Sequence, residues 1–288
     1  QSTEGWFLEY GGSDPGYQSL CLQFLSQIAE ELEDASLNFA IEKCVQFLAY
    51  FLHPDLSFGG EYGSRRTQTL YLGGFSILSE RNHLASKIVS EGLKGQRRGA
   101  ILSFLECDIA NLAPMAESMI ISYKYFNPKL SSKKLPYQKE NFKISFEECG
   151  LFIYSDKKYY MIISIHLGGI LKLFDKQKRK ILLNDCGYII KNGNNKKFTN
   201  QFQQKNVKFY LDGDELVVES SLYELKTTQI SPLKFIALRF LNLTVMRNVV
   251  LGNLIKKLLV RVLINYNHKE MYKLNRKINF TDGKIKIC

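Results

Sequence analysis

Hydrophobic residues in the first half of the chain recur every three or four positions, a period typical of amphipathic helices. The clearest stretch runs over 37–52, from Leu37 through Ile41 and Leu48 to Leu52, and ends at the "HPD" of 53–55. The same spacing predicts helices over 17–32, 68–78, 82–94, 97–106 and 111–125. We therefore expect residues 1–126 to be helical, with successive helices forming antiparallel pairs.

After residue 141 the hydrophobic period changes from 3.6 to 2. Runs such as "KYYMIISIH" and "DELVVESSLYEL" are short, rich in β-branched and aromatic residues, and separated by Gly, Asp and Asn turns. This pattern predicts an antiparallel β-sandwich over 142–288, with one inserted helix near 246–265. Residues 127–141, rich in proline, serine and lysine, are typical of a linker. The predicted fold class is α+β with two domains.

Charge is distributed unevenly along the chain. The net charge is +11, with 39 Lys+Arg and 28 Asp+Glu. Residues 1–135 hold 12 basic and 15 acidic residues, which leaves 27 and 13 for 136–288. A basic half attracts nucleic acid, anionic lipid or acidic polysaccharide, although abundant Lys and Asn on solvated faces explain the excess equally well. Nucleic acid is disfavoured because no RRM, KH or helix-turn-helix signature is present.

Several kinds of site and segment are not indicated. The six cysteines form no CxxC pair, and the four histidines show no HxH or HExxH spacing, so neither a metal site nor a cofactor is expected. Basic residues interrupt the apolar stretch 233–265, which argues against a membrane span. No signal peptide is visible, but the chain begins with Gln, so the compartment stays open.

The loop at 5–19, "GWFLEYGGSDPGYQS", sets aromatic and ionisable side chains among glycines before the first helix. Aromatic faces stack on sugar rings, and carboxylates and amides bind hydroxyls. The alternative is a structural turn, with Asp14 capping the helix, Pro15 in its first position and Trp6 in the core. The candidate binding residues are Trp6, Glu9, Tyr10, Asp14, Tyr17 and Gln18.

A second loop, "HPDLSFGGEYGSRRTQTLY" at 53–71, has the same composition. An arginine beside a tyrosine favours the phenolate, which would make Tyr62 useful for proton transfer. The alternative is a connection between helices with a surface Glu–Arg pair. His166, in "SIHLGG" at the end of a predicted strand, is either a functional residue or a packed one. The candidates of this second group are His53, Glu61, Tyr62, Arg65, Arg66 and His166.

Two loops and a pair of predicted strands together resemble heparinase II/III-like and related alginate lyase families. They are "EYGGSDPGYQS" at 9–19, "DLSFGGEYGSR" at 55–65, and "HLGGILKLFD" with "LLNDCGYI" at 166–175 and 182–189. The resemblance implies an incomplete α/α toroid, of which this chain supplies the C-terminal part, followed by a β-sandwich. It also implies binding of an acidic polysaccharide between them.

The resemblance implies cleavage of the polysaccharide by β-elimination. A base removes the C5 proton of a uronate, hydrogen-bond donors neutralise its carboxylate, and an acid protonates the leaving oxygen. Matched by segment, Tyr62 would transfer the proton, Arg65 or Arg66 would bind the carboxylate, Glu61 would orient them, and His166 would act from the sandwich side. The adjacent Asn-His pair usual in these families is absent. Two alternatives stay open: a uronate C5-epimerase, and a carbohydrate-binding or polysaccharide-assembly protein without catalysis.

Overall fold

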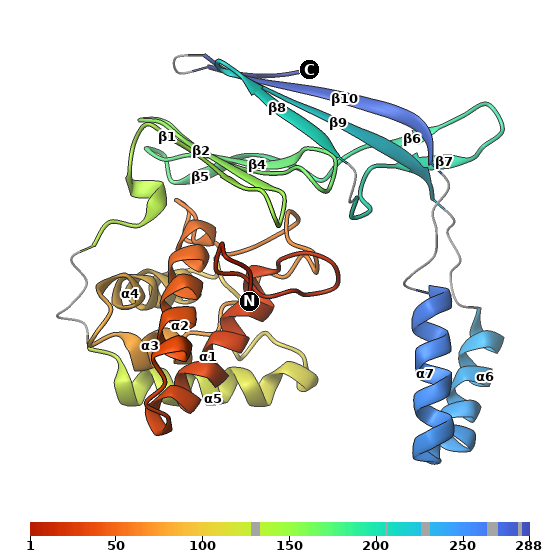
Figure 1. Ribbon diagram of the computed structural model, residues 1–288, viewed down its shortest axis with the longest axis horizontal. Coiled ribbons are helices and arrows are strands. Elements are labelled where there is room, and N and C mark those ends of the chain that lie inside the picture. Colours follow the sequence, from red (N-terminus) through yellow and green to blue (C-terminus); the bar gives the residue numbers. More distant parts are fainter. Residues whose placement is uncertain (128–132, 205–206, 226–230, 264–269, 282–283) are drawn as a thin grey trace. The chain divides into compact units, whose positions relative to one another are not determined.

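The computed structural model describes residues 1–127, 133–204, 207–225, 231–263, 270–281 and 284–288. Within these residues the fold is α+β, with seven α-helices and two antiparallel sheets (Figure 1). The helices are α1 (Pro15–Glu31), α2 (Ala35–Leu48), α3 (Gly73–Leu78), α4 (His83–Arg97), α5 (Ile109–Tyr125), α6 (Pro232–Leu243) and α7 (Val249–Leu263). The 3-10 helices are η1 (Ala49–Phe51), η3 (Pro136–Gln138) and η4 (Val245–Arg247).

The first sheet has five strands in the order of the sequence. They are β1 (Phe142–Phe146), β2 (Leu151–Ser155), β3 (Tyr159–Ser164), β4 (Ile170–Asp175) and β5 (Lys180–Asp185). The second sheet has the order β11-β10-β9-β7-β6, with β8 also paired to β9. Its strands are β6 (Ile189–Lys191), β7 (Lys197–Thr199), β8 (Lys208–Asp212), β9 (Glu215–Glu224), β10 (Glu270–Thr281) and β11 (Lys284–Ile287).

The chain divides into two compact units. The first comprises residues 1–187, 201–220 and 275–288, and the second comprises 188–200 and 221–274. Helices α1–α5 and the whole first sheet belong to the first unit, and the hairpin of α6 and α7 belongs to the second. The predicted linker over 127–141 ends with η3 in the first unit, and its residues 128–132 lie outside the described part of the chain.

In the first unit, β2, β3 and β4 are buried on both faces. Alternate residues such as Ile153 and Ile162 join a hydrophobic cluster shared with α1–α4, while Phe152 and Met161 join a second cluster shared with β9 and β10. Tyr154 stacks on Phe280 across this second cluster, with ring centroids 4.6 Å apart. Successive side chains of a strand point to opposite faces of the sheet. An uninterrupted apolar run therefore provides one apolar face for the helices and another for the second sheet.

One predicted helix is wrong, and one helix of the structure was not predicted. No helix forms over 97–106, because α4 ends where Gly99 adopts a φ of +69° and the amide of Ala100 returns to the carbonyl of Gly95 at 2.9 Å. The helix predicted near 246–265 corresponds to α7, with residues 264 and 265 outside the described part of the chain, whereas α6 before it was not predicted. Ser231 and Asn248 each accept a hydrogen bond from the first turn of the following helix, so both helix starts are capped.

Candidate functional site

The two glycine-rich loops of the sequence lie against each other in the first unit. Asp14 caps α1 by accepting a hydrogen bond from the amide of Tyr17 at 3.1 Å. Its other carboxylate oxygen accepts from the amides of Arg65 at 3.0 Å and Thr67 at 3.3 Å, and the hydroxyl of Thr67 also donates to Asp14. Since Asp14 is fully buried, one carboxylate fixes both the start of α1 and the loop that carries Arg65.

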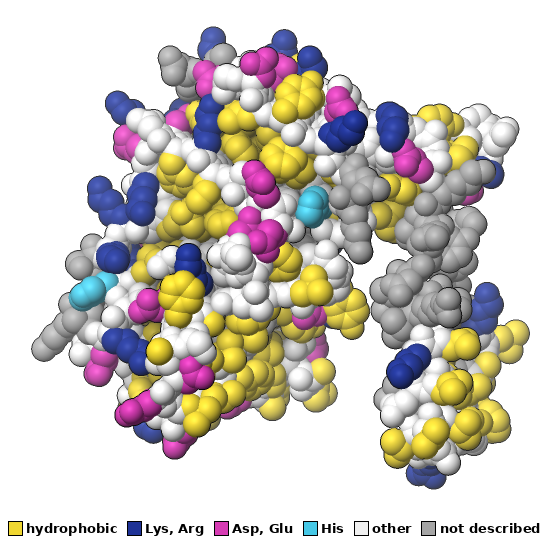
Figure 2. All heavy atoms as spheres, viewed as in Figure 1, with side chains coloured by type: hydrophobic (Ala, Val, Ile, Leu, Met, Phe, Trp, Pro, Cys, Tyr) yellow, Lys and Arg dark blue, Asp and Glu magenta, His cyan; other side chains and the backbone are white. Residues whose placement is uncertain are grey.

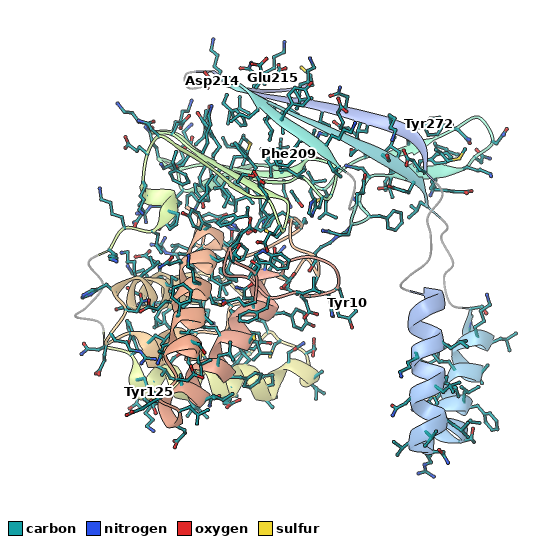
Figure 3. All side chains as sticks on the ribbon, in the orientation of Figure 1. Tyr10, Tyr125, Phe209, Asp214, Glu215 and Tyr272 are labelled. Atoms are coloured by element: carbon teal, nitrogen blue, oxygen red, sulfur yellow. The ribbon has the colours of Figure 1, made fainter. Side chains whose placement is uncertain are left out.

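Arg65 is the centre of a polar cluster on the surface of these loops, formed with Glu9, Tyr10 and Tyr17. Its guanidinium donates to Glu9 Oε1 and to the hydroxyl of Tyr17, each at 3.1 Å. The same guanidinium lies 4.3 Å from the ring centroid of Tyr10 and 4.6 Å from that of Tyr17. Tyr10 is 61% exposed and projects outward from its loop (Figure 3), and Tyr17 is 38% exposed. This cluster therefore offers two aromatic faces, a cation and a phenol to solvent.

Tyr62 does not lie beside Arg65, contrary to the expectation from sequence. Its hydroxyl is 2.8 Å from Nε2 of His53, and both side chains are buried. Nδ1 of His53 is 2.9 Å from the hydroxyl of Ser57, which donates to Asp55 at 2.6 Å. Because the Ser57 proton is directed to Asp55, the His53 proton is directed to Ser57, and Nε2 accepts the proton of Tyr62. The four side chains form a series of hydrogen bonds in which Tyr62 donates to His53, His53 donates to Ser57, and Ser57 donates to Asp55.

The ionisation of this buried pair follows from its environment. Burial, followed by the positive charge of Lys172, holds the pKa of His53 well below its ordinary value of 6.5. Burial, followed by the neighbouring Tyr160 and acidic groups, raises the pKa of Tyr62 well above 10.0. Both groups are therefore neutral near pH 7, so Tyr62 is no phenolate base in this arrangement.

Glu61 pairs with a lysine that the sequence analysis did not single out. Lys172 lies on β4 with its side chain 7% exposed, and its Nζ is 3.4 Å from Oε2 of Glu61. Burial would raise the pKa of Glu61, but hydrogen bonds from its own backbone and from Asn184, together with Lys172, hold that pKa below its ordinary value. A lysine inside the apolar run "GILKLFD" was the signal for this contact, because a cation in a buried strand needs a partner.

His166 lies in the turn between β3 and β4 and is half-buried. Its Nδ1 is 3.4 Å from Nε2 of Gln203, and burial lowers its pKa. Gln203 lies against the first loop as well, because a Cβ on Gly12 would come within 3.0 Å of the same Nε2. Gln203 thus connects His166 to the loop that carries Glu9 and Tyr10. Sequence reasoning missed Gln203, which lies in a segment with no distinctive pattern.

Three further candidates have mainly structural contacts. Trp6 is 7% exposed and its indole donates to Glu4 at 2.9 Å. The amide of Gln18 is buried and donates to the carbonyl of Gly5 at 2.9 Å. Arg66 has a φ of +57° and donates to the carbonyl of Gln201 at 2.9 Å, which ties the second loop to the segment before Gln203. These contacts position the loops.

The side chains of the described residues offer no ready metal site. No group of three or more His, Cys, Asp or Glu side chains in that part of the chain is placed to hold a metal ion. In the same residues, no helix has both the length and the apolar character needed to cross a membrane.

Comparison with known families and with curated proteins gave no match for this chain.

Proposed function

We propose that this protein binds an acidic polysaccharide at the Arg65 cluster and cleaves it by β-elimination. The observation that carries the proposal is the contact of one partly exposed guanidinium with the hydroxyl of Tyr17 and with the rings of Tyr10 and Tyr17. A uronate offers a carboxylate that Arg binds and a sugar ring that stacks on an aromatic face. The α-helices and two antiparallel sheets are consistent with part of an α/α toroid and a β-sandwich, which we propose as the finer architecture.

In this proposal Tyr17 takes the role that the sequence suggested for Tyr62. The hydroxyl of Tyr17 gives its proton to the leaving glycosidic oxygen as the bond from C4 to that oxygen breaks. The guanidinium of Arg65 donates to the phenol oxygen at 3.1 Å and would stabilise the negative charge left there. Tyr10, the most exposed ring of the cluster, would support the sugar ring.

The base in this proposal is His166. Burial lowers its pKa, so the imidazole is neutral near pH 7 and has a lone pair available for the C5 proton. The electron pair of the C5–H bond becomes the C4=C5 double bond, and the C4–O pair leaves with the oxygen that Tyr17 protonates. Nε2 of Gln203 can only donate, so the lone pair of the His166 ring lies on Nδ1, and the substrate would displace this 3.4 Å contact to bring its C5 proton to Nδ1.

A second candidate function is binding without cleavage, and the ion pair of Arg65 favours it. Glu9 already accepts from this guanidinium at 3.1 Å, so a uronate carboxylate must share or displace that contact. A protein that only holds the polysaccharide would use the same two rings and the same cation without proton transfer.

The test is incubation of the protein with alginate, heparan sulfate, chondroitin sulfate and hyaluronan while the ultraviolet absorbance of unsaturated uronates is followed. We expect a rise that Tyr17→Phe abolishes and that Tyr210→Phe, a change of another exposed tyrosine in the first unit, leaves intact. A rise that survives Tyr17→Phe contradicts the assignment of Tyr17. Binding without a rise, lost in Arg65→Gln, supports the second candidate, and C5 proton exchange with D2O without cleavage supports an epimerase.

A further inference from the structure

The hairpin of α6, η4 and α7 in the second unit exposes an unusual amount of apolar surface. None of the residues of α6 is buried. Across 232–258, large hydrophobic side chains that are more than a third exposed crowd the visible face of the hairpin (Figure 2). They are Leu233, Phe235, Ile236, Leu238, Phe240, Leu243, Val245, Val249, Val250, Leu251, Leu254 and Leu258. An apolar surface of this extent is typical of a binding surface.

The charge of the same segment has one sign. Residues 225–269 contain no Asp or Glu, and they contain eight basic residues: Lys226, Lys234, Arg239, Arg247, Lys256, Lys257, Arg261 and Lys269. In the rest of the chain, 28 acidic residues are interspersed with the remaining basic ones. The hairpin therefore combines an exposed apolar surface with basic residues and no acidic ones.

We infer that this hairpin docks on the surface of a membrane that contains anionic lipids. Amphipathic helices with Leu, Phe and Val on one face and Lys or Arg on the other bury the apolar face at the boundary between headgroups and acyl chains. The basic side chains then lie among the anionic headgroups. Helices of 12 and 15 residues are about 18 and 22 Å long, a length that suits this position in the plane of the interface.

A second copy of the hairpin and a nucleic acid each match only one of these two features. A second copy of the hairpin would cover the apolar residues but would bring its own six basic residues and no acidic ones against those of the first. Nucleic acid would neutralise the charge but would leave the rings of Phe235 and Phe240 in water. An anionic lipid surface satisfies both features at once, and it adds an activity that the proposed polysaccharide chemistry does not require.

The test is co-sedimentation of the full chain with vesicles of phosphatidylcholine alone and of phosphatidylcholine mixed with phosphatidylglycerol. We expect binding only to the mixed vesicles, and weaker binding as salt rises. Replacing Lys234, Arg239 and Lys257 with Gln should weaken binding about fivefold for each charge removed. The matched control replaces Lys208, Lys284 and Lys286 in the first unit, which are exposed as well, and should change binding little.

A second variant tests the apolar contact. Phe240→Ser with Leu254→Ser should weaken binding as well, while the thermal melt of the protein stays unchanged because both side chains are more than half exposed. Equal binding to the two kinds of vesicle, no binding to either, or an equal loss in the control variant would overturn the inference. Self-association of the lipid-free chain that the Ser variant removes would overturn it in favour of a second copy.

Discussion

The carboxylate of Asp14 accepts a hydrogen bond from the backbone amide of Arg65 at 3.0 Å, across 51 residues of sequence. The same side chain caps α1 by accepting from the amide of Tyr17. One buried group therefore sets the position of the Arg65 backbone relative to the Tyr17 backbone. The side-chain contact between Arg65 and Tyr17 depends on this link between the loops.

Asp14→Ala should therefore destabilise the protein more than the loss of an ordinary helix cap. The variant removes the cap and leaves the part-buried amides of Arg65 and Thr67 without their acceptor, for a loss of roughly 2–4 kcal/mol in the free energy of unfolding. Chemical denaturation measures this loss. The matched control is Asp34→Ala, which removes the exposed cap of α2 and should cost less. Equal losses in the two variants would show that Asp14 is only a cap.

For the first loop, at 5–19, the sequence was sufficient to predict a structural turn, but it was not sufficient to predict a binding role. Asp14 caps α1, Pro15 begins it and Trp6 is buried, all of which confirm the predicted turn. Caps and apolar periods are local, so they are readable from neighbouring residues. The partner of Arg65 is a different matter, because Tyr17 and Tyr62 both lie in loops of the same composition and only the fold brings Tyr17 to the guanidinium.

The helix wrongly predicted over 97–106 and the missed α6 have a similar explanation. Apolar spacing over 97–106 matches a helix, but Ile101 is buried by the turn that ends α4 rather than by a helical face. In 232–263 the apolar residues are so frequent that spacing alone does not mark where one helix ends and the next begins. Apolar runs in the sequence indicated that β2–β4 are buried on both faces. Only the tertiary contacts show that the helices cover one face and strands β9 and β10 cover the other.

Gly150→Ala should displace the ring of His166. Gly150 has a φ of +67°, and a Cβ there would lie 2.3 Å from Cγ of His166. Alanine in this left-handed conformation costs about 1–2 kcal/mol of backbone strain. The steric conflict between its Cβ and the imidazole of His166 adds to that cost. The measurement is the free energy of unfolding together with the NMR signals of the His166 ring.

The control for this change is Gly213→Ala. Gly213 has a φ of +56°, and a Cβ added there would meet no heavy atom within 4 Å, so only the backbone strain applies. A larger loss at Gly150 and a shift of the His166 signals are expected. The same loss at both glycines, with unshifted signals, would show that the ring moves aside freely.

The pair of Glu61 and Lys172 should respond unequally to removal of either partner. Glu61→Gln leaves the buried ammonium of Lys172 without its carboxylate, at a cost of about 1–3 kcal/mol in the free energy of unfolding. Lys172→Met should cost less, because the side chain of Glu61 is 24% exposed and keeps a hydrogen bond from Gln68 at 3.2 Å. Denaturation of the two single variants and the double variant measures the coupling.

The double variant should be more stable than Glu61→Gln alone, since the unpaired cation is gone. An exposed pair in the same unit provides the comparison: Asp214→Asn, which breaks the contact with Lys143, should change stability by less than about 0.5 kcal/mol. Additive effects of Glu61→Gln and Lys172→Met would contradict a buried ion pair.

The buried His53 should make the protein less stable as the pH falls below about 6.5. Its pKa is well below 6.5 in the folded state, so below that pH the unfolded chain binds a proton that the folded chain does not. Stability is therefore complete above pH 6.5 and falls with decreasing pH, by at most about 1.4 kcal/mol per pH unit. His166, whose pKa burial also lowers, adds to the slope in the same direction.

His53→Gln separates this contribution from the others. Denaturation between pH 6.5 and pH 4.5, above the ordinary pKa of Glu61, should show a shallower slope in the variant even though the variant is less stable at pH 7. His83→Gln, at an exposed histidine on α4, should leave the slope as it is. In the series of hydrogen bonds that ends at Asp55, His53 is the acceptor of the Tyr62 proton. An unchanged slope in His53→Gln would therefore mean that the imidazole of His53 already reaches water in solution. The buried series of hydrogen bonds would then be open.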